Sequence, residues 1–295
     1  MTLALLTAAE WPQGDADDQY LLDALQQRGI AAQWQIWQMS EHLPAYDLCL
    51  IRSVWDYHLK PQAFLQFIQD YSAHTPVLNP ANVVVWNSEK TYLRELQKAG
   101  LPVAETHWID QLPQPDDFVQ LLSTVDTEEW FLKPIIGADA SGTLRFKADR
   151  AGTDSAMNHL QQQLAHSGMM LQPFLPSVAD EGELSVIYVG EQLTHAVIKK
   201  PQRGDYRVQD TFGGVDCAYD IQADERAVAD QCMAYLWRRF GPLCYARLDF
   251  LRNLSGQWVI NEVELIEPSL FFRHCPQAAQ ALADYIVQNF HYKQT

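Results

Sequence analysis

The sequence predicts a Rossmann-like α/β domain at the amino terminus, followed by a larger α+β region. Within the first 80 residues, short apolar runs alternate with helical apolar patterns, which is the rhythm of an open parallel sheet. The second half offers strands joined by short turns, which favours antiparallel hairpins. The chain has 295 residues, 47% hydrophobic and 20% charged, and is therefore long and apolar enough for two or three domains.

The amino-terminal elements follow one another as strand, helix, strand, strand and helix. We predict strands at 3–6, 30–36 and 48–51, and helices at 17–28 and 61–73. Gly29 ends the first helix in the position where glycine is favoured. The turn after the first strand has no glycine fingerprint, so a dinucleotide site is not predicted there.

From Asn87 the pattern changes. We predict a helix at 88–99, with Tyr92, Leu93 and Leu96 on its apolar side and Gly100 at its end. The later strands are predicted at 130–134, 169–174, 184–189, 195–200, 243–251 and 257–265, and the later helices at 155–166, 224–240 and 276–290. The expected domains are therefore 1–86, a first lobe at 87–172 and a second lobe at 173–295.

Composition excludes several classes of function. The formal net charge of −16 opposes binding to nucleic-acid backbones and anionic membranes. Five cysteines, an odd number without a CxxC pair, argue against a disulfide framework or a zinc site. The sequence shows neither a basic, apolar leader nor a membrane-length apolar stretch. We therefore expect a cytoplasmic protein without nucleic-acid or membrane partners.

Three carboxylates on two successive strands give the sharpest chemical signal. Arg247 and Asp249 alternate with apolar residues and share one face, and so do Glu262 and Glu264. If the turn at 253–256 closes an antiparallel hairpin, Asp249 lies opposite Glu262 and Arg247 opposite Glu264. Crowded, buried carboxylates require a cation, and Mg²⁺ with substrate phosphates is the commonest. The alternative, a solvated charged face, is disfavoured because the flanking residues are apolar.

Two lysines and a loop suggest phosphate binding. Lys133 lies in a short apolar strand and needs an anion, unless it is an edge residue that reaches solvent. Lys90 lies in the first turn of the predicted helix, where a bound phosphate would offset its unfavourable interaction with the helix dipole. The small residues at 137–143 allow backbone N–H groups to approach phosphate, although an ordinary hairpin loop fits them too.

Further along, residues 169–176 form an extended apolar segment whose prolines fix its shape. Its backbone edge suits an adenine, and Glu183 suits ribose hydroxyls. An interdomain hinge and a surface carboxylate are the alternatives.

The stretch at 52–57 follows an apolar strand, where open parallel sheets bind ligands. Arg52 suits a substrate carboxylate, and Asp56, beside Tyr57, suits an ammonium. An internal salt bridge is an equally good reading of the same residues.

Taken in order, these elements resemble the ATP-grasp superfamily. The resemblance to bacterial glutathione synthetase spans nearly the whole chain, through residues 87–104, 131–134, 172–186, 199–202, 206–207 and 246–264. The stretches 51–57 and 261–270 are similar to a narrower branch, which includes the ligase that cyclises O-ureido-D-serine to D-cycloserine. The resemblance implies a two-lobed ATP-grasp domain after the Rossmann-like domain.

The resemblance also implies a role for each site residue. The residues that would bind ATP are Lys90 and Lys133 at the phosphates, Gly137, Ser141 and Gly142 in a mobile flap at 137–143, Gln172, Phe174 and Leu175 at the adenine, and Glu183 at the ribose. Those that would bind two Mg²⁺ ions, with Mn²⁺ as an alternative, are Asp249, Glu262 and Glu264. Those that would steady the transferred phosphoryl group are Arg247, Lys199 and Arg207. The substrate residues remain Arg52, Asp56 and Tyr57.

Two departures from glutathione synthetase stand out. That enzyme has an asparagine at the position of Glu264, and a basic residue for its substrate where this chain has Ser185. Glutathione synthesis is therefore disfavoured.

The implied activity is a Mg²⁺- and ATP-dependent carboxylate–amine ligase. It would act on a small amino-acid-like substrate through an acyl phosphate and release ADP and phosphate; an O-ureido-serine-type cyclo-ligase is one such enzyme. The alternative is a non-catalytic nucleotide-binding regulatory protein of the same fold. Related enzymes are often dimers or tetramers, so a homo-oligomer is compatible with the resemblance.

Overall fold

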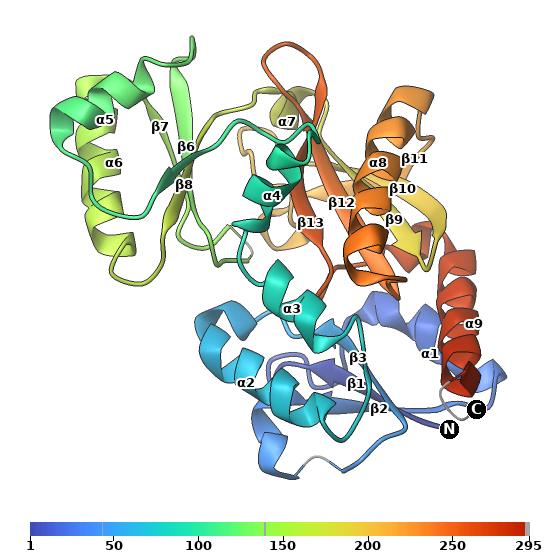
Figure 1. Ribbon diagram of the computed structural model, residues 1–295. Helices are drawn as coiled ribbons and strands as arrows, with labels where there is room; N and C mark the ends of the chain where they lie inside the picture. Colours follow the sequence, from blue (N-terminus) through green and yellow to red (C-terminus); the bar gives the residue numbers. More distant parts are fainter. Residues whose placement is uncertain (43, 139, 293–295) are drawn as a thin grey trace.

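The computed structural model describes residues 1–42, 44–138 and 140–292, and its strands form three sheets. Figure 1 shows the five-stranded sheet in the middle, with the amino-terminal sheet below it and a four-stranded sheet with two helices to the left. Asp139, in the predicted loop 137–143, lies outside the described residues. Within the described ranges, no helix is both long and apolar enough to cross a membrane.

The amino-terminal sheet is parallel, with the strand order β2-β1-β3-β4, as the alternating pattern predicts. Its elements are β1 (Thr2–Thr7), α1 (Gln19–Gln27), β2 (Ala31–Ile36), β3 (Leu48–Ser53), α2 (Pro61–Ser72), β4 (Val77–Leu78) and α3 (Ala81–Asn87). Along β1, Leu3 and Leu5 pack on the α1 side, whereas Ala4 and Leu6 pack on the α2 side. A strand buried on both faces has a continuous apolar sequence, which explains the unbroken run in β1.

The four-stranded sheet is antiparallel, with the order β5-β8-β6-β7. Its elements are β5 (His107–Ile109), α5 (Pro115–Leu122), β6 (Glu129–Pro134), β7 (Leu144–Lys147), α6 (Arg150–Gln163) and β8 (Met169–Pro173). The helix predicted at 155–166 begins five residues earlier because the Asp149 side chain accepts a hydrogen bond from the backbone N–H of Gly152 (2.8 Å). Trp130 and Leu132 of β6 pack in one core with Phe118 of α5 and Leu160 of α6.

The central sheet has the order β11-β10-β9-β12-β13 and is antiparallel throughout. Its strands and remaining helices are α4 (Tyr92–Lys98), α7 (Ser177–Asp180), β9 (Glu183–Val189), β10 (Gln192–Lys200), β11 (Val215–Tyr219), α8 (Ala223–Phe240), β12 (Tyr245–Arg252), β13 (Trp258–Glu264) and α9 (Pro276–Tyr292). Leu184, Val186 and Leu248 face α8 and α4 across one apolar core. The opposite face is therefore left for the polar residues of the same strands.

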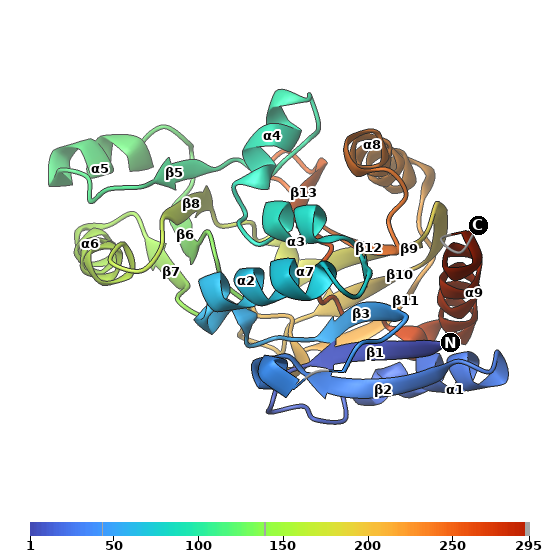
Figure 2. The ribbon, with the colours of Figure 1, turned by 60° about the horizontal axis from the view of Figure 1, so that its bottom comes forward.

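Two helices join parts of the molecule that the predicted domain boundaries separate. Leu93 and Leu96 of α4 pack in the core of the central sheet, although residues 87–172 were expected to form the first lobe. At the carboxyl terminus α9 lies beside α1 in Figure 2, and Arg28 Nε is 2.7 Å from Asp284 Oδ1. The last helix, α9, thus packs on the amino-terminal domain.

The helix predicted at 88–99 is shorter than expected, because α4 begins only at Tyr92. Ser88 is the C-cap residue of α3, and its hydroxyl donates a hydrogen bond to the Val85 carbonyl (2.9 Å). Ser88 therefore ends one helix and does not begin the next. Lys90 lies in the turn between the two helices, and the helix-dipole argument for phosphate at this lysine is wrong. Its backbone N–H instead donates to the Ile135 carbonyl (2.8 Å), which joins this turn to the end of β6.

Candidate active site

A cavity of about 1050 Å³ lies where the three sheets meet. Its wall takes Trp55 from the amino-terminal domain, Phe131 from the four-stranded sheet and Asp249 from the central sheet. Pockets at the meeting of domains are the usual place for ligand binding. The cavity is large enough for a nucleotide together with a small second substrate.

The hairpin of β12 and β13 supplies the polar face of this cavity. Asp249 pairs with Glu262 and Arg247 with Glu264, which confirms the register expected from the sequence. The ladder shifts after Asp249, where Asn261 is the extra residue of a β-bulge. In a regular strand Ile260 and Glu262 would share a face. The bulge allows Ile260 to pack in the core while Glu262 faces the cavity.

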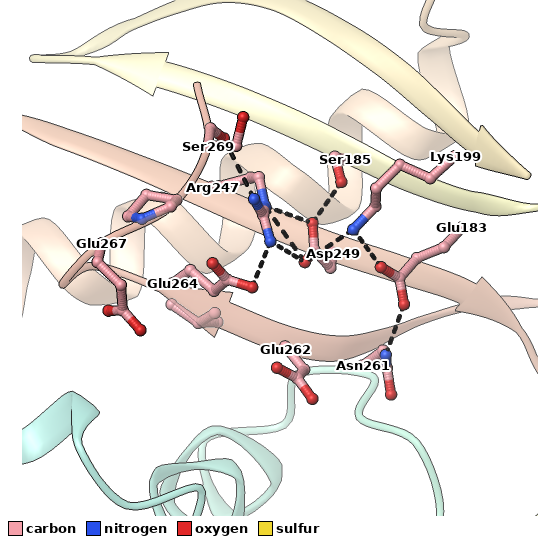
Figure 3. A network of polar contacts seen from close by, with 12 residues as sticks. Glu183, Ser185, Lys199, Arg247, Asp249, Asn261, Glu262, Glu264, Glu267 and Ser269 are labelled. Carbon is pink, nitrogen blue, oxygen red and sulfur yellow. Dashed lines mark hydrogen bonds and ion pairs between the residues drawn. The ribbon is translucent and has the colours of Figure 1, made fainter. Parts of the chain in front are cut away.

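Arg247 lies at the centre of the charge network in Figure 3. Its guanidinium donates to both oxygens of Asp249, with Nε 3.0 Å from Oδ1 and Nη2 3.0 Å from Oδ2. It also donates to Glu264 and to the carbonyl of Ser269 (3.2 Å). Burial alone would raise the pKa of Asp249, but Arg247 and then Lys199 outweigh it and hold this pKa well below its usual value.

Lys199, on β10, lies between a carboxylate on β9 and a carboxylate on β12. It forms an ion pair with Glu183, and its Nζ is 3.3 Å from Asp249 Oδ2. Burial lowers the pKa of Lys199, but Asp249 and Glu183 outweigh this effect and leave the pKa raised. Ser185, next to Asp249 in the ladder, donates its hydroxyl to that carboxylate. Glu183 therefore belongs to the charge network and also lines the cavity, and its contact with ribose stays a prediction.

Two further lysines bind Glu262. Lys133 Nζ is 3.3 Å from Oε1 and Lys90 Nζ is 3.6 Å from Oε2. Lys133 is only 6% exposed and lies on β6, between β7 and β8, so the solvent-reaching edge lysine is excluded. Burial favours the neutral acid, but Lys90 and Lys133 outweigh it and lower the pKa of Glu262. Lys90 also donates to the carbonyl of Gly137 (2.8 Å), which links it to the loop at 137–143.

The carboxylates fit magnesium in chemistry, while lysine and arginine balance their charges in this structure. Asp249, Glu262 and Glu264 offer the oxygen donors that Mg²⁺ prefers. Among the described residues, however, no three acidic, histidine or cysteine side chains converge closely enough to hold an ion. Lys90 and Lys133 hold Glu262 instead. A metal here therefore requires these lysines to leave Glu262, and phosphate oxygens are the partners that would draw them away.

The predicted nucleotide wall is aromatic. Gln172, Phe174 and Leu175 line the cavity beside Phe131. Tyr206, which the sequence did not assign, meets Phe131 and Phe174 edge-on, with ring centroids 5.4 and 6.0 Å apart. Such rings suit the flat face of a nucleobase.

The predicted flap reaches the same wall. Gly137 and Ser141 line the cavity, whereas Gly142 does not and lies beneath Gln163. Gly142 has a φ of +69°, a conformation that favours glycine. Arg207 lines the cavity as well, paired with Asp205 (2.7 Å) and stacked over Phe212 (3.8 Å).

Among the predicted substrate residues, Arg52 does not line the cavity. It is 3% exposed and its Nη2 lies 2.9 Å from Asp18 Oδ1, so the internal salt bridge is the correct reading. Alternation along β3 turns its side chain toward the carboxyl-terminal segment, where it donates to the Pro268 carbonyl (3.2 Å). Asp56 and Tyr57 do line the cavity.

The Arg52–Asp18 pair leads to a stability prediction. Replacing Arg52 by methionine leaves Asp18 buried without its partner, and we expect this to lower the free energy of unfolding by about 3 kcal/mol. Adding Asp18→Asn should recover more than half of that loss. As a control, Arg226→Met removes an exposed pair with Asp230 (60% and 50% exposed) and should change stability by less than about 1 kcal/mol. Urea unfolding followed by tryptophan fluorescence measures all four proteins, and equal losses for the two single variants would contradict the prediction.

Sequence reasoning missed several cavity residues. Asn261 donates to Glu183 (2.8 Å) and accepts from Lys133 (3.2 Å), yet its position depends on a bulge that alternation does not reveal. Tyr206 lies in a stretch that resembles glutathione synthetase, so the resemblance offered a signal that went unused. Glu267 lines the cavity beyond the end of β13, where no strand pattern continues.

The fold and the site define an ATP-grasp enzyme, and two family models agree. Residues 3–79 match the amino-terminal domain of the D-cycloserine synthetase DcsG, and residues 116–268 match the ATP-grasp domain of prokaryotic glutathione synthetase. Because the second match covers just over half of the chain, the chain belongs to the ATP-grasp family. It is an ATP-dependent ligase that forms C–N bonds.

Individual relatives indicate which branch of the ATP-grasp family this chain resembles. The cycloserine biosynthesis protein DcsG of Streptomyces lavendulae is 30% identical over 296 residues, which cover 96% of this chain and 98% of that protein. The glutathione synthetase of Ralstonia nicotianae is 21% identical and covers 77% of this chain and 62% of that protein.

Solved structures give the same result. The crystal structure of D-cycloserine synthetase DcsG superposes with a TM-score of 0.88 at 27% identity and covers 98% of this chain and 100% of that one. The D-alanine–D-alanine ligase from Bacillus anthracis, at 12% identity and a TM-score of 0.66, shares the fold alone; the match covers 99% of this chain and 98% of that one. The resemblance inferred from the sequence is confirmed, together with its fold class.

Proposed function

We propose that this chain is a Mg²⁺- and ATP-dependent carboxylate–amine ligase that activates a small amino-acid-like substrate as an acyl phosphate. The observation that carries the proposal is the composition of one cavity. Buried Lys133 and partly buried Lys90 face carboxylates on the central hairpin, and the amino-terminal domain closes the other side. Phosphate-binding cations, metal-binding oxygens and room for a second substrate thus share one space.

The roles of the residues follow from their charges. Lys90 and Lys133 bind the ATP phosphates, which replace Glu262 as their partner. Asp249, Glu262 and Glu264 hold two Mg²⁺ ions, or Mn²⁺, which supply charge neutralisation at the phosphates. Arg247, Lys199 and Arg207 surround the transferred phosphoryl group. The described cavity needs no protein nucleophile for this chemistry, because positioning and charge neutralisation account for the transfer.

In the first step, a substrate carboxylate oxygen attacks the γ-phosphorus of ATP, which gives an acyl phosphate and ADP. In the second, a nitrogen attacks the acyl carbon and phosphate leaves with that same oxygen. The nitrogen belongs either to a second molecule or to the same one. The similarity to a cycloserine biosynthesis protein over almost the whole chain favours the second case, an O-ureido-serine-type cyclo-ligase.

Oxygen labelling tests this chemistry. Purified protein with Mg²⁺-ATP and a panel that includes O-ureido-D-serine and other amino acids should release ADP. With ¹⁸O in the substrate carboxylate, one label should appear in the released phosphate, because that oxygen bridges carbon and phosphorus in the acyl phosphate. Mass spectrometry of the phosphate and the product measures both results. Release of AMP, or unlabelled phosphate beside a ligated product, would overturn the proposal.

The same assay addresses the alternative of a non-catalytic regulatory protein. That protein would bind ATP without releasing ADP across the whole panel. The retained set of Lys133, Asp249, Glu262 and Glu264 argues against it, because a site without turnover has no need of four balanced charges, two of them buried.

A further inference from the structure

We propose that Glu267 binds the ammonium group of the amino-acid-like substrate, an assignment that rests on the proposed function. Glu267 lies three residues beyond the end of β13 and lines the cavity. In Figure 3 its side chain points away from the network around Arg247. It is therefore a carboxylate of the cavity that the nucleotide and metal chemistry does not use.

Charge balance separates Glu267 from the neighbouring carboxylates. Asp249 and Glu264 pair with Arg247, Glu262 pairs with Lys133, and Glu183 pairs with Lys199. Among the described residues, the carboxylate of Glu267 forms no ion pair and accepts no hydrogen bond from another side chain, and Lys90 and Arg247 act on it only from a distance. Glu267 is only partly exposed, and a carboxylate without an ion pair in such a place would be stabilised by a cationic ligand.

The surroundings of Glu267 also favour a cation. The indole N–H of Trp55 donates a hydrogen bond to the backbone carbonyl of Glu267 (3.0 Å), and this bond fixes the Trp55 ring at this end of the cavity. Trp11 packs edge-on against that ring, with centroids 5.0 Å apart. Aromatic faces attract ammonium groups. Burial, and then Glu264, raise the pKa of Glu267 to about 8, although Lys90 and Arg247 act in the opposite direction.

The comparison with Asp56 decides which acid takes the ammonium. Asp56 was expected to do so, and it lines the same cavity. Its two oxygens, however, already accept hydrogen bonds from Trp37 (2.8 Å) and from Gln38. The carboxylate of Glu267 accepts no hydrogen bond from any other described residue. The substrate is thereby oriented with its ammonium toward Trp55 and its reacting carboxyl toward the cations around Asp249.

A cycle of two changes tests this contact. The substrate is the amino acid with which the wild-type protein releases ADP fastest. It is compared with its desamino analogue, which has hydrogen in place of the amino group. In the wild type, loss of the amine should lower kcat/KM by at least about tenfold, the effect of one charged hydrogen bond. In Glu267→Gln, the amino acid should lose a similar factor while its desamino analogue loses less than about threefold. The KM for ATP should be unchanged.

Glu10→Gln is the matched control, because Glu10 is an exposed carboxylate that lines the same cavity. It should leave the discrimination against the desamino analogue intact. Equal discrimination in the wild type and Glu267→Gln, or the same loss in both variants, would overturn the assignment while ADP release continues. A raised KM for ATP in Glu267→Gln would overturn it as well. Absence of ADP release from the wild type with every amino acid would overturn the proposed function, and this assignment with it.

Discussion

Replacing Glu262 by glutamine is expected to lower the rate of ADP release by about a thousandfold, or about 4 kcal/mol of transition-state stabilisation. The change leaves the size of the side chain almost the same but removes the charge that Lys90 and Lys133 share. It also removes one of the three proposed magnesium ligands. ADP release at saturating ATP, measured over a range of Mg²⁺ concentrations, should show both the lower rate and a higher Mg²⁺ requirement.

The control is Glu89→Gln, one residue before Lys90, where the carboxylate is exposed and does not line the cavity. This variant should keep the wild-type rate and the wild-type Mg²⁺ requirement. If Glu262→Gln retained more than about a tenth of the wild-type rate, Glu262 would be a structural partner of the lysines and not part of the reacting site.

The hairpin shows how far sequence alone can reach. The alternation of polar and apolar residues, together with a turn at 253–256, was sufficient to predict that Asp249 pairs with Glu262. The structure confirms this pairing. The same alternation could not reveal the bulge at Asn261, because a bulge is defined by the partner strand. Asn261 places its side-chain amide between Glu183 and Lys133. These contacts of the site therefore depend on how two strands pair, which the sequence of one strand does not reveal.

The predictions for Arg52 and Lys90 failed for the same physical reason. The roles of Arg52 and Lys90 were each predicted from their nearest neighbours in the sequence. In the structure, the partners of both side chains are residues far away in the sequence. Arg52 is paired by Asp18, which comes 34 residues earlier. Lys90 is held by Glu262 and by the carbonyl of Gly137. Local patterns indicate that a charge needs a partner, but they do not say which partner lies within reach in the fold.

The cavity also explains why the three parts of the chain are needed together. Glu262 interacts with lysines from the turn before α4 and from β6. Tyr245, on the hairpin strand β12, donates to the carbonyl of Ile51 in β3 (2.8 Å). Motion between the sheets would therefore change the distances between these charges.

The second large effect is expected at Arg247. Arg247→Met should lower kcat by about a thousandfold, because in the proposed mechanism its guanidinium neutralises charge on the phosphoryl group as it is transferred. Arg247→Lys should keep the charge but lose the fork that holds Asp249 and Glu264, and we expect about a hundredfold loss. In both variants the affinity for a non-hydrolysable ATP analogue should stay within about threefold of the wild type, since the contact acts in the transition state.

Arg247 also has a structural role, which a further variant separates from catalysis. Removing it leaves Glu264 without its cation and Asp249 with Lys199 alone, so Arg247→Met should also be less stable. Adding Glu264→Gln removes the unpaired charge and should restore most of the thermal stability without restoring kcat. Melting temperature and single-turnover ADP formation, measured on the same samples, give the two results. If kcat returned with stability, Arg247 would act only by holding the network in place, and its direct role at the phosphoryl group would be wrong.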